Sequence, residues 1–302
     1  MKVSADRPRL REQMTGMAFA APFIVGFSVF LAYPLVQAVH FSFTQYPMLQ
    51  SPMWIGLDNF RALMVDPDFW KSLRNTLLFA LMSVPFTMGI SVMLALLLNC
   101  PIKAPGVWRT IVFLPSLVPS VASAMLWLWL LNGKDGLLNV LLRNVAGVFG
   151  LQFTPPDWLG SQTIVLPVLA FIGFWGVGNT VVIFLAGLQD IPREMYEAAE
   201  IDGAGAWQRL RHVTLPMLSP VMFFNLIMGI IGSWSIFDVP YILTGGGGTN
   251  HAAYFYTMYI RDAAFIYTEA GKASALAMIQ FLIVTVLTVL VVWSSRRWVH
   301  YR

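Results

Sequence analysis

The chain has 302 residues, of which 57% are hydrophobic and only 11% are charged. Soluble domains average about 25% charged residues, so this composition argues against a water-soluble enzyme, and it is too apolar for an intrinsically disordered chain. The formal net charge is +4. In so apolar a chain, we expect basic residues to set membrane orientation rather than to bind nucleic acid. The single cysteine, Cys100, excludes an internal disulfide.

Apolar stretches between the charged residues are long enough for membrane-spanning helices. A helix needs about 20 mostly apolar residues to cross a hydrocarbon core of roughly 30 Å. The sequence therefore predicts an all-α, polytopic membrane protein, with six transmembrane helices in one permease domain over 16–302. In chain order, the predicted spans are 16–43, 75–100, 110–132, 163–188, 217–243 and 273–295.

Prolines inside several of these stretches predict bent helices, because proline removes a backbone hydrogen bond that neighbouring helices can replace. Two interpretations stay open. The bends either give the helices their shape or allow a central cavity to open and close. The prolines are Pro34, Pro85, Pro115, Pro119, Pro167 and Pro240.

The distribution of Lys and Arg predicts the orientation. With the N-terminus inside, 12 of the 19 basic residues lie in cytoplasmic segments and 7 lie outside. We therefore expect a cytoplasmic N-terminal segment, 1–15, and a cytoplasmic C-terminus in a multi-pass plasma membrane protein. The Ala18-Phe19-Ala20 string precedes the first apolar run rather than following it. The first stretch is thus predicted to be an anchor and not a removed signal peptide.

The predicted cytoplasmic loop, 190–216, has the features of two short helices. Asp190 can cap the first, with Pro192 in its first turn, where a missing N–H costs little. Gly203 is placed to end that helix in a left-handed turn, and a second short helix follows over about 205–213. We expect a compact knob with small alanines for close approach and carboxylates for a partner's basic residues. The alternative is an ordinary loop on the membrane surface.

In this loop, a Glu-Ala-Ala string is followed at fixed spacing by Asp-Gly-Ala and then by Leu-Pro. The pattern resembles the EAA motif of binding-protein-dependent ABC importer permeases. The resemblance implies the type I ABC importer permease fold, with a loop that docks into a cleft on a cytoplasmic ATPase subunit. The residues that carry it are Glu197, Ala198, Ala199, Asp202, Gly203, Ala204, Leu215 and Pro216.

Further strings resemble the carbohydrate branch of these permeases, the maltodextrin and glycerol-3-phosphate type. The resemblance implies translocation of a carbohydrate or a related sugar or polyol derivative across a bacterial inner membrane. The implied partners are a second homologous permease, two cytoplasmic ATP-binding subunits and an extracytoplasmic solute-binding protein. The strings begin at Asn75, Arg109, Phe113, Gly136, Ala186, Phe237, Leu243 and Gly271.

ATP hydrolysis is expected in separate subunits. The sequence lacks a Gly-x-x-x-x-Gly-Lys-Ser/Thr phosphate-binding loop. The resemblance therefore implies a transport subunit that is not an enzyme and holds no cofactor, with ATP and Mg²⁺ bound by the ATPase subunits. The four histidines are dispersed, so we expect no metal or catalytic site.

Polar and aromatic residues at mid-membrane depth are candidates for the substrate pathway, since sugars need hydrogen bonds and flat apolar surfaces. The resemblance places the sugar near the spans on either side of the loop, although the partner permease is an alternative holder. An acidic residue in a span is a functional hypothesis by default. Asp238 is alternatively a structural acceptor at the membrane edge, satisfied by water or Arg261. The candidates are Trp175, Gly176, Asn179, Gly229, Ser233 and Asp238.

Three rival functions differ in what they require. An ion-driven secondary transporter would need titratable groups deep in several spans, and only Asp238 approaches this requirement. A membrane-embedded enzyme would need catalytic side chains clustered at one depth. An importer permease for glycerol-3-phosphate or another non-sugar solute would share the loop.

Overall fold

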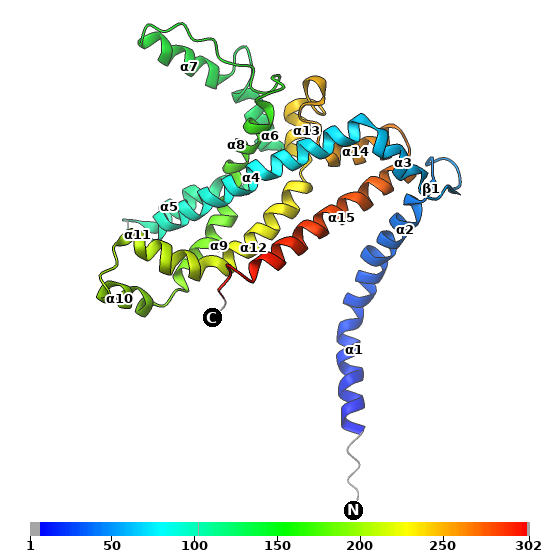
Figure 1. Cartoon of the computed structure of the whole chain (residues 1–302), viewed down its shortest axis with the longest axis horizontal. Helices are drawn as coiled ribbons and strands as arrows, with labels where there is room; N and C mark the ends of the chain where they lie inside the picture. The colour runs from blue at the N-terminus through cyan, green and yellow to red at the C-terminus, as the bar shows by residue number, and fades with distance from the viewer. Residues whose placement is uncertain (1–6, 102, 301–302) are drawn as a thin grey trace, which may run out of the picture. The chain divides into compact units, whose positions relative to one another are not determined.

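The computed structural model describes residues 7–101 and 103–300 (Figure 1). Within them the fold is helical apart from a two-stranded antiparallel pairing, so the all-α prediction is confirmed. Predictions for residues 1–6 of the N-terminal segment, and for the last two residues, lie outside the described part. The chain forms two compact units, which are described separately.

The first unit combines the N-terminal part of the chain up to Val65 with residues 262–279. Its N-terminal helix runs without interruption from the described start to Ser42, although its middle turn widens into a π-helix. The elements are α1 (Arg7–Phe27), η1 (Ser28–Ala32), α2 (Tyr33–Ser42), β1 (Thr44–Gln45), β2 (Met53–Trp54), α3 (Asp58–Val65), η6 (Asp262–Ile266) and the first part of α15 (Ala270–Ser295).

The short hairpin of this unit is fixed by side-chain hydrogen bonds. The Asn59 amide donates to the backbone carbonyls of Ser42, at 3.0 Å, and Thr44, at 2.8 Å. Gly271, at the start of α15, lies so close to the Thr44 carbonyl that any Cβ there would overlap it. These contacts join the end of the first helix to the start of the last one.

The second unit holds most of the remaining helices and the second half of α15. Its longest helix begins earlier than the predicted span at 75, because Asp66 caps it through the Asp68 amide, with Pro67 in the first turn. The elements are α4 (Pro67–Asn99), α5 (Pro105–Phe113), η2 (Leu114–Leu117), α6 (Ser120–Leu130), α7 (Leu137–Val148), α8 (Val165–Ile172), η3 (Gly173–Gly176), α9 (Gly178–Gln189), α10 (Arg193–Ile201), α11 (Ala206–Arg209), η4 (Leu210–Thr214), α12 (Leu215–Trp234), α13 (Asp238–Thr244), η5 (Thr249–His251) and α14 (Tyr256–Arg261).

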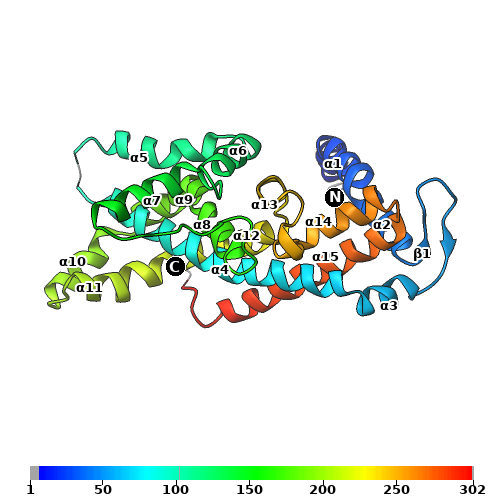
Figure 2. The same ribbon diagram turned by 90° about the horizontal axis from the view of Figure 1, so that it is seen from above.

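The core of this unit lies where α4, α9 and α12 pack together (Figure 1, Figure 2). Ala95, Phe184 and Leu218, one from each helix, are completely buried there. A Cβ at Gly187 would lie 2.7 Å from Cγ2 of Val221, so a glycine permits the close approach of α9 to α12. Small residues are typical of contacts between membrane helices.

Four helices in the described residues are long and apolar enough to cross a membrane, or six if each of two bent pairs is one span. The stretch predicted at 110–132 bends by 94° between η2 and α6. Pro119 explains the break, since the preceding Val118 is extended, as residues before proline prefer to be. The stretch predicted at 163–188 bends by 56° at η3.

The stretch predicted at 217–243 is also two helices in the structure. Helix α12 ends at Trp234, and α13 begins at Asp238. The intervening Phe237 has φ −142° and ψ −61°, which is not helical. Hydrophobicity alone did not reveal this break because the apolar composition continues through it.

The Asn75-Thr76 string near the start of α4 has a clear structural role. The Asn75 amide donates to the carbonyls of His251, at 3.0 Å, and Tyr254, at 3.1 Å. The Thr76 hydroxyl accepts from the Tyr256 amide at 2.9 Å. These buried bonds satisfy backbone groups of an irregular segment and fix it against α4.

Candidate functional site

The loop at 190–216 begins with α10, whose C-terminal end is well defined. The Ala204 amide donates to the Ala199 carbonyl at 2.9 Å, and the Gly203 amide donates to the Glu200 carbonyl at 3.0 Å. Gly203 has φ +74°, so the predicted left-handed end of this helix is confirmed. Non-glycine residues strongly disfavour this conformation.

The predicted start of α10 is wrong. Pro192, rather than Asp190, occupies the capping position before its first helical residue. Asp190 instead continues the end of α9, because its amide donates to the Ala186 carbonyl at 3.1 Å. The two turns follow so closely that sequence alone assigned the aspartate to the wrong helix.

The predicted second short helix, 205–213, is not a separate element. It forms the first turns of a continuous helix over Ala206–Trp234. The turn over Leu210–Thr214 is a π-helix, in which the Leu215 amide donates to the Leu210 carbonyl. This wider turn comes immediately before Pro216, whose ring would crowd the preceding turn of a regular α-helix.

Helix α10 contacts the start of the following helix through Tyr196 and Glu200. The Tyr196 hydroxyl lies 3.1 Å from the Thr214 hydroxyl, and Glu200 pairs with Arg209 at the surface. A cavity of about 710 Å³ lies at this junction, between the end of α4 and the loop, with Tyr196 and Arg209 in its wall. The two ends of the loop are packed into the core, because Ile191 belongs to the core cluster and Val213 is buried. Its middle, from Glu197 to Gln208, is mostly exposed.

The outer surface of the loop combines acidic and apolar side chains. Glu197 and Ala198 of the motif are exposed, as are Asp202 and Gly203, whereas Ala199, Ala204, Leu215 and Pro216 are half-buried. Ile201 is 87% exposed and Trp207 is 69% exposed. Such large apolar side chains, beside a glycine turn and surrounded by charge, are typical of a protein contact surface.

The last described residues lie at the same end of the second unit as this loop (Figure 1). The His300 amide donates to the Ser219 hydroxyl at 2.9 Å. Ser219 lies in the first turns of α12, three residues after Pro216. The Trp298 ring also packs edge-on against Phe223, with 6.2 Å between centroids. The loop and the C-terminal residues therefore share one face of this unit.

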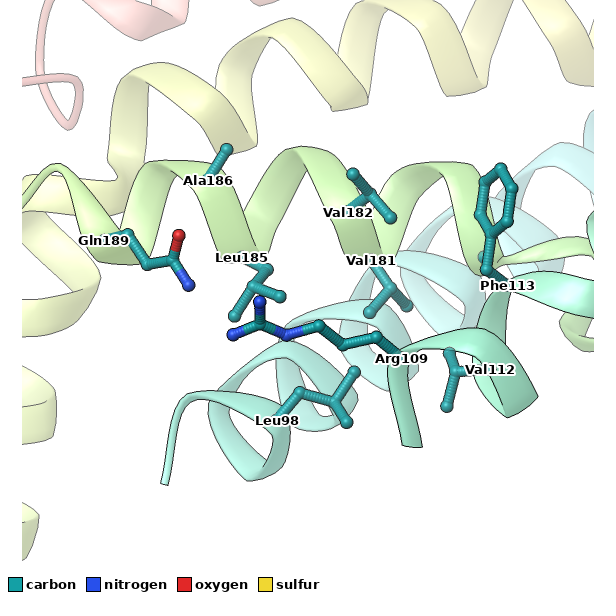
Figure 3. Close-up of a pocket in the computed structure, with 10 residues that line it drawn as sticks. Leu98, Arg109, Val112, Phe113, Val181, Val182, Leu185, Ala186 and Gln189 are labelled. Carbon is teal, nitrogen blue, oxygen red and sulfur yellow. The ribbon is translucent and has the colours of Figure 1, made fainter. Parts of the chain in front are cut away.

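A small apolar pocket of about 200 Å³ lies beside α9 (Figure 3). Leu98, Val181 and Leu185 line it, and the side chains of Arg109 and Gln189 extend toward the same end of it. The Arg109-Thr110 string of the sequence thus lies against the last turns of α9, which lead into the loop.

The structure places the predicted substrate residues in different environments. Trp175, Gly176 and Asn179 are exposed at or beside the break between α8 and α9. The Trp175 ring meets Trp127 edge-on, with 5.8 Å between centroids. Ser233, by contrast, is buried and donates to the Ile230 carbonyl of its own helix at 2.8 Å.

The remaining two substrate candidates also differ. Gly229 faces α4, where a Cβ would lie 3.2 Å from Cγ1 of Val84, so its role there is close packing. Asp238 is exposed in the first turn of α13 and accepts from the Ser120 hydroxyl at 3.2 Å. This bond joins α13 to the first residue of α6, at the bend. No local pattern predicts it.

The relatives of this chain define its class. Residues 88–300 match the family described as the binding-protein-dependent transport system inner membrane component. The chain belongs to that family and is an inner membrane permease component. This membership confirms the resemblance carried by the Glu-Ala-Ala and Leu-Pro strings.

Relatives match almost the whole chain. It is 37% identical over 294 residues to the probable ABC transporter permease protein YesP of Bacillus subtilis. This alignment covers 96% of this chain and 93% of YesP. It is 33% identical to the lactose transport system permease protein LacF of Rhizobium radiobacter, with 94% of each covered. It is 32% identical to the trehalose/maltose transport system permease protein MalF of Thermococcus litoralis, with 93% of each covered.

A solved structure shares the fold. A chain of the bacterial alginate ABC transporter, in complex with an alginate pentasaccharide-bound periplasmic protein, aligns with a TM-score of 0.80. The alignment covers 96% of both chains at 23% identity. The fold is thus that of an ABC importer permease, as the sequence predicted.

Proposed function

We propose that this chain is one permease subunit of an ATP-driven importer for a carbohydrate or a related sugar or polyol derivative. The observation that carries the substrate class is the set of relatives named for lactose, trehalose/maltose and arabinooligosaccharide transport. A solute-binding protein delivers the solute outside the cell, and a second permease completes the pore. A glycerol-phosphate solute remains the alternative substrate.

In this proposal, the loop at 190–216 transmits the movement of the ATPase subunits. Glu197 and Ala198 are exposed for contact, and the small Ala199 lets the partner approach α10 closely. Asp202, Gly203 and Ala204 shape the turn, while Leu215 and Pro216 join it to α12. Because the loop continues directly into α12, a force on it reaches a membrane helix without an intervening flexible linker.

The proposed orientation places this loop and both termini in the cytoplasm. The shared face of the loop and the C-terminal residues supports this orientation, since His300 lies against the start of α12. ATP and Mg²⁺ are then bound by the ATPase subunits and not by this chain.

For the solute pathway, we infer that the exposed residues at the helix breaks are the better candidates. Trp175, Gly176 and Asn179 at one break, and Asp238 at another, present open surfaces and polar groups. Gly229 and Ser233 are engaged in helix packing and in a bond to their own helix, so we expect them to support the pathway without touching the solute.

The coupling role is tested by distorting the turn at Gly203. A valine at this φ of +74° costs roughly 1–2 kcal/mol of local strain, with open space around it. We expect the Gly203→Val subunit to fold and assemble with its partner permease, but to lose ATPase co-purification and ATP-dependent uptake in vesicles.

Gly56 supplies the matched control, because it has φ +63° and open space in the first unit. Gly56→Val carries similar strain, and this variant should retain both ATPase co-purification and ATP-dependent uptake. Normal ATPase binding together with normal uptake in the Gly203 variant would contradict the coupling role. Uptake that persists without ATP would instead favour an ion-driven transporter.

A further inference from the structure

Helix α7 carries two kinds of surface that the transport mechanism does not use. Leu137, Leu141, Val145 and Val148 recur at spacings of one helical turn and are all exposed. Arg143 and Gly147 lie on the other side of the helix, which is also exposed. A helix with one apolar and one polar side, and no protein covering the apolar side, is typical of a membrane interface.

The connections of α7 keep it close to the ends of apolar helices. Only residues 131–136 separate it from α6, whose last turns contain Trp127 and Trp129. On its other side, the Trp158 indole donates to the Asn139 side chain at 2.7 Å, a few residues before α8. Tryptophans concentrate at membrane–water interfaces, so these anchors place α7 at that depth.

An apolar cavity of about 630 Å³ lies beneath the same helix. Leu138 and Leu142 of α7 line it together with Trp127, Trp158 and Phe171. Because the Trp158 indole N–H is already bonded to Asn139, the wall offers hydrocarbon rather than a hydrogen-bond donor at this point. Its chemistry fits an acyl chain better than a sugar or a charged solute.

The polar side of α7 bears charges of both signs nearby. The Arg143 guanidinium donates to the backbone carbonyls of Asn139, at 3.3 Å, and Lys134, at 2.5 Å. Asp135 and Asp157 are exposed in the adjoining segments. This side suits water and lipid headgroups, whereas the opposite side carries no charge and has the Asn144 amide at its edge.

We propose that α7 lies in the plane of the membrane surface, with its exposed leucines and valines in the lipid acyl region and a lipid chain in the cavity beneath it. Helix α6, which comes just before α7 in the chain, also exposes apolar side chains, with Met125 61% and Trp129 62% exposed. Exposed apolar side chains on both helices, together with the apolar cavity beneath α7, favour lipid over a water-soluble protein as the occupant. In the proposed orientation, α7 belongs to the outer leaflet.

The single cysteine of the chain makes a direct test practical. In a Cys100→Ser background, one cysteine is introduced at Leu141, Val145 or Gly147 and carries a nitroxide spin label in the assembled transporter in phospholipid vesicles. A Cβ at Gly147 meets nothing within 4 Å, so Gly147→Cys is a control on the polar side. Collisions with oxygen, which enters lipid, are compared with those of a water-soluble nickel chelate.

The labels at Leu141 and Val145 should collide preferentially with oxygen, and the label at Gly147 should collide preferentially with the nickel chelate. Bromine-labelled acyl chains should also quench tryptophan fluorescence more weakly in a Trp158→Phe variant. Preference for the nickel chelate at all three sites would overturn the proposal, because α7 would then lie in water. Protection of Leu141 and Val145 from both reagents in the assembled transporter without binding protein would also overturn it, because another protein would then cover α7.

Discussion

The helix core around α4, α9 and α12 and the loop at 190–216 are built in opposite ways. In the core, Phe184 and Leu218 are completely buried, and glycine lets backbones approach closely. In the loop, Ile201 and Trp207 are largely exposed. Tyr196 is the residue of α10 that packs against the core, and its hydroxyl contacts that of Thr214. Removing a side chain should therefore alter stability in the first region and partner binding in the second.

The first region is tested by Phe184→Ala. Truncating a fully buried phenylalanine removes its packing contacts and leaves a cavity, which costs about 3–5 kcal/mol in well-packed cores. We expect a strongly lowered melting temperature in detergent and a poor yield of the assembled transporter. Phe224→Ala, on the half-exposed side of α12, is the control and should change the melting temperature little.

The second region is tested by Trp207→Ala. Since this side chain is 69% exposed, we expect the melting temperature of the subunit to stay nearly constant. A tryptophan at the centre of a protein contact contributes about 2 kcal/mol or more, roughly 30-fold in affinity. Binding of the ATPase subunits, measured by titration in nanodiscs, should weaken by that order.

Trp129→Ala serves as the control for this prediction, because Trp129 is similarly exposed on α6, remote from the loop. Unchanged ATPase affinity in the Trp207 variant would show that the exposed apolar side chains of the loop are not the contact surface.

The smallest effect is expected from Tyr196→Phe, which removes the hydroxyl contact with Thr214. A hydrogen bond of this kind contributes about 1 kcal/mol to local stability. The population of molecules in which α10 is detached from the following helix should therefore rise about fivefold. Hydrogen exchange of the α10 amides should report this, with core amides unchanged. Tyr33→Phe, an exposed tyrosine of α2, is the control. Equal exchange in the two variants would mean that another contact holds α10.

Local chemistry explains which parts of the site were predictable. The left-handed end at Gly203 follows from its place after a helical stretch, and the structure confirms it. The start of α10 was assigned to Asp190 because both it and Pro192 suit a helix start, but the aspartate prolongs α9. Neighbouring helices compete for such residues, and only their final packing decides.

Contacts distant in sequence were beyond prediction. Asp238 finds Ser120, 118 residues away, and Asn75 fixes the carbonyls of His251 and Tyr254. Neither pairing leaves a periodic pattern in the chain. The side chains of α7 were likewise noted only as a string, since their exposure depends on what the rest of the fold leaves uncovered.

The sequence by itself determined the membrane class, the helical fold and the place of the loop, because burial in lipid demands long apolar helices and backbone turns demand glycine. Tertiary structure alone decided where those helices bend, that the second part of the loop belongs to α12, and which polar side chains are buried. The physical reason is that hydrophobicity fixes whether a segment enters the membrane, whereas its bends and partners depend on the particular neighbours that replace its lost hydrogen bonds.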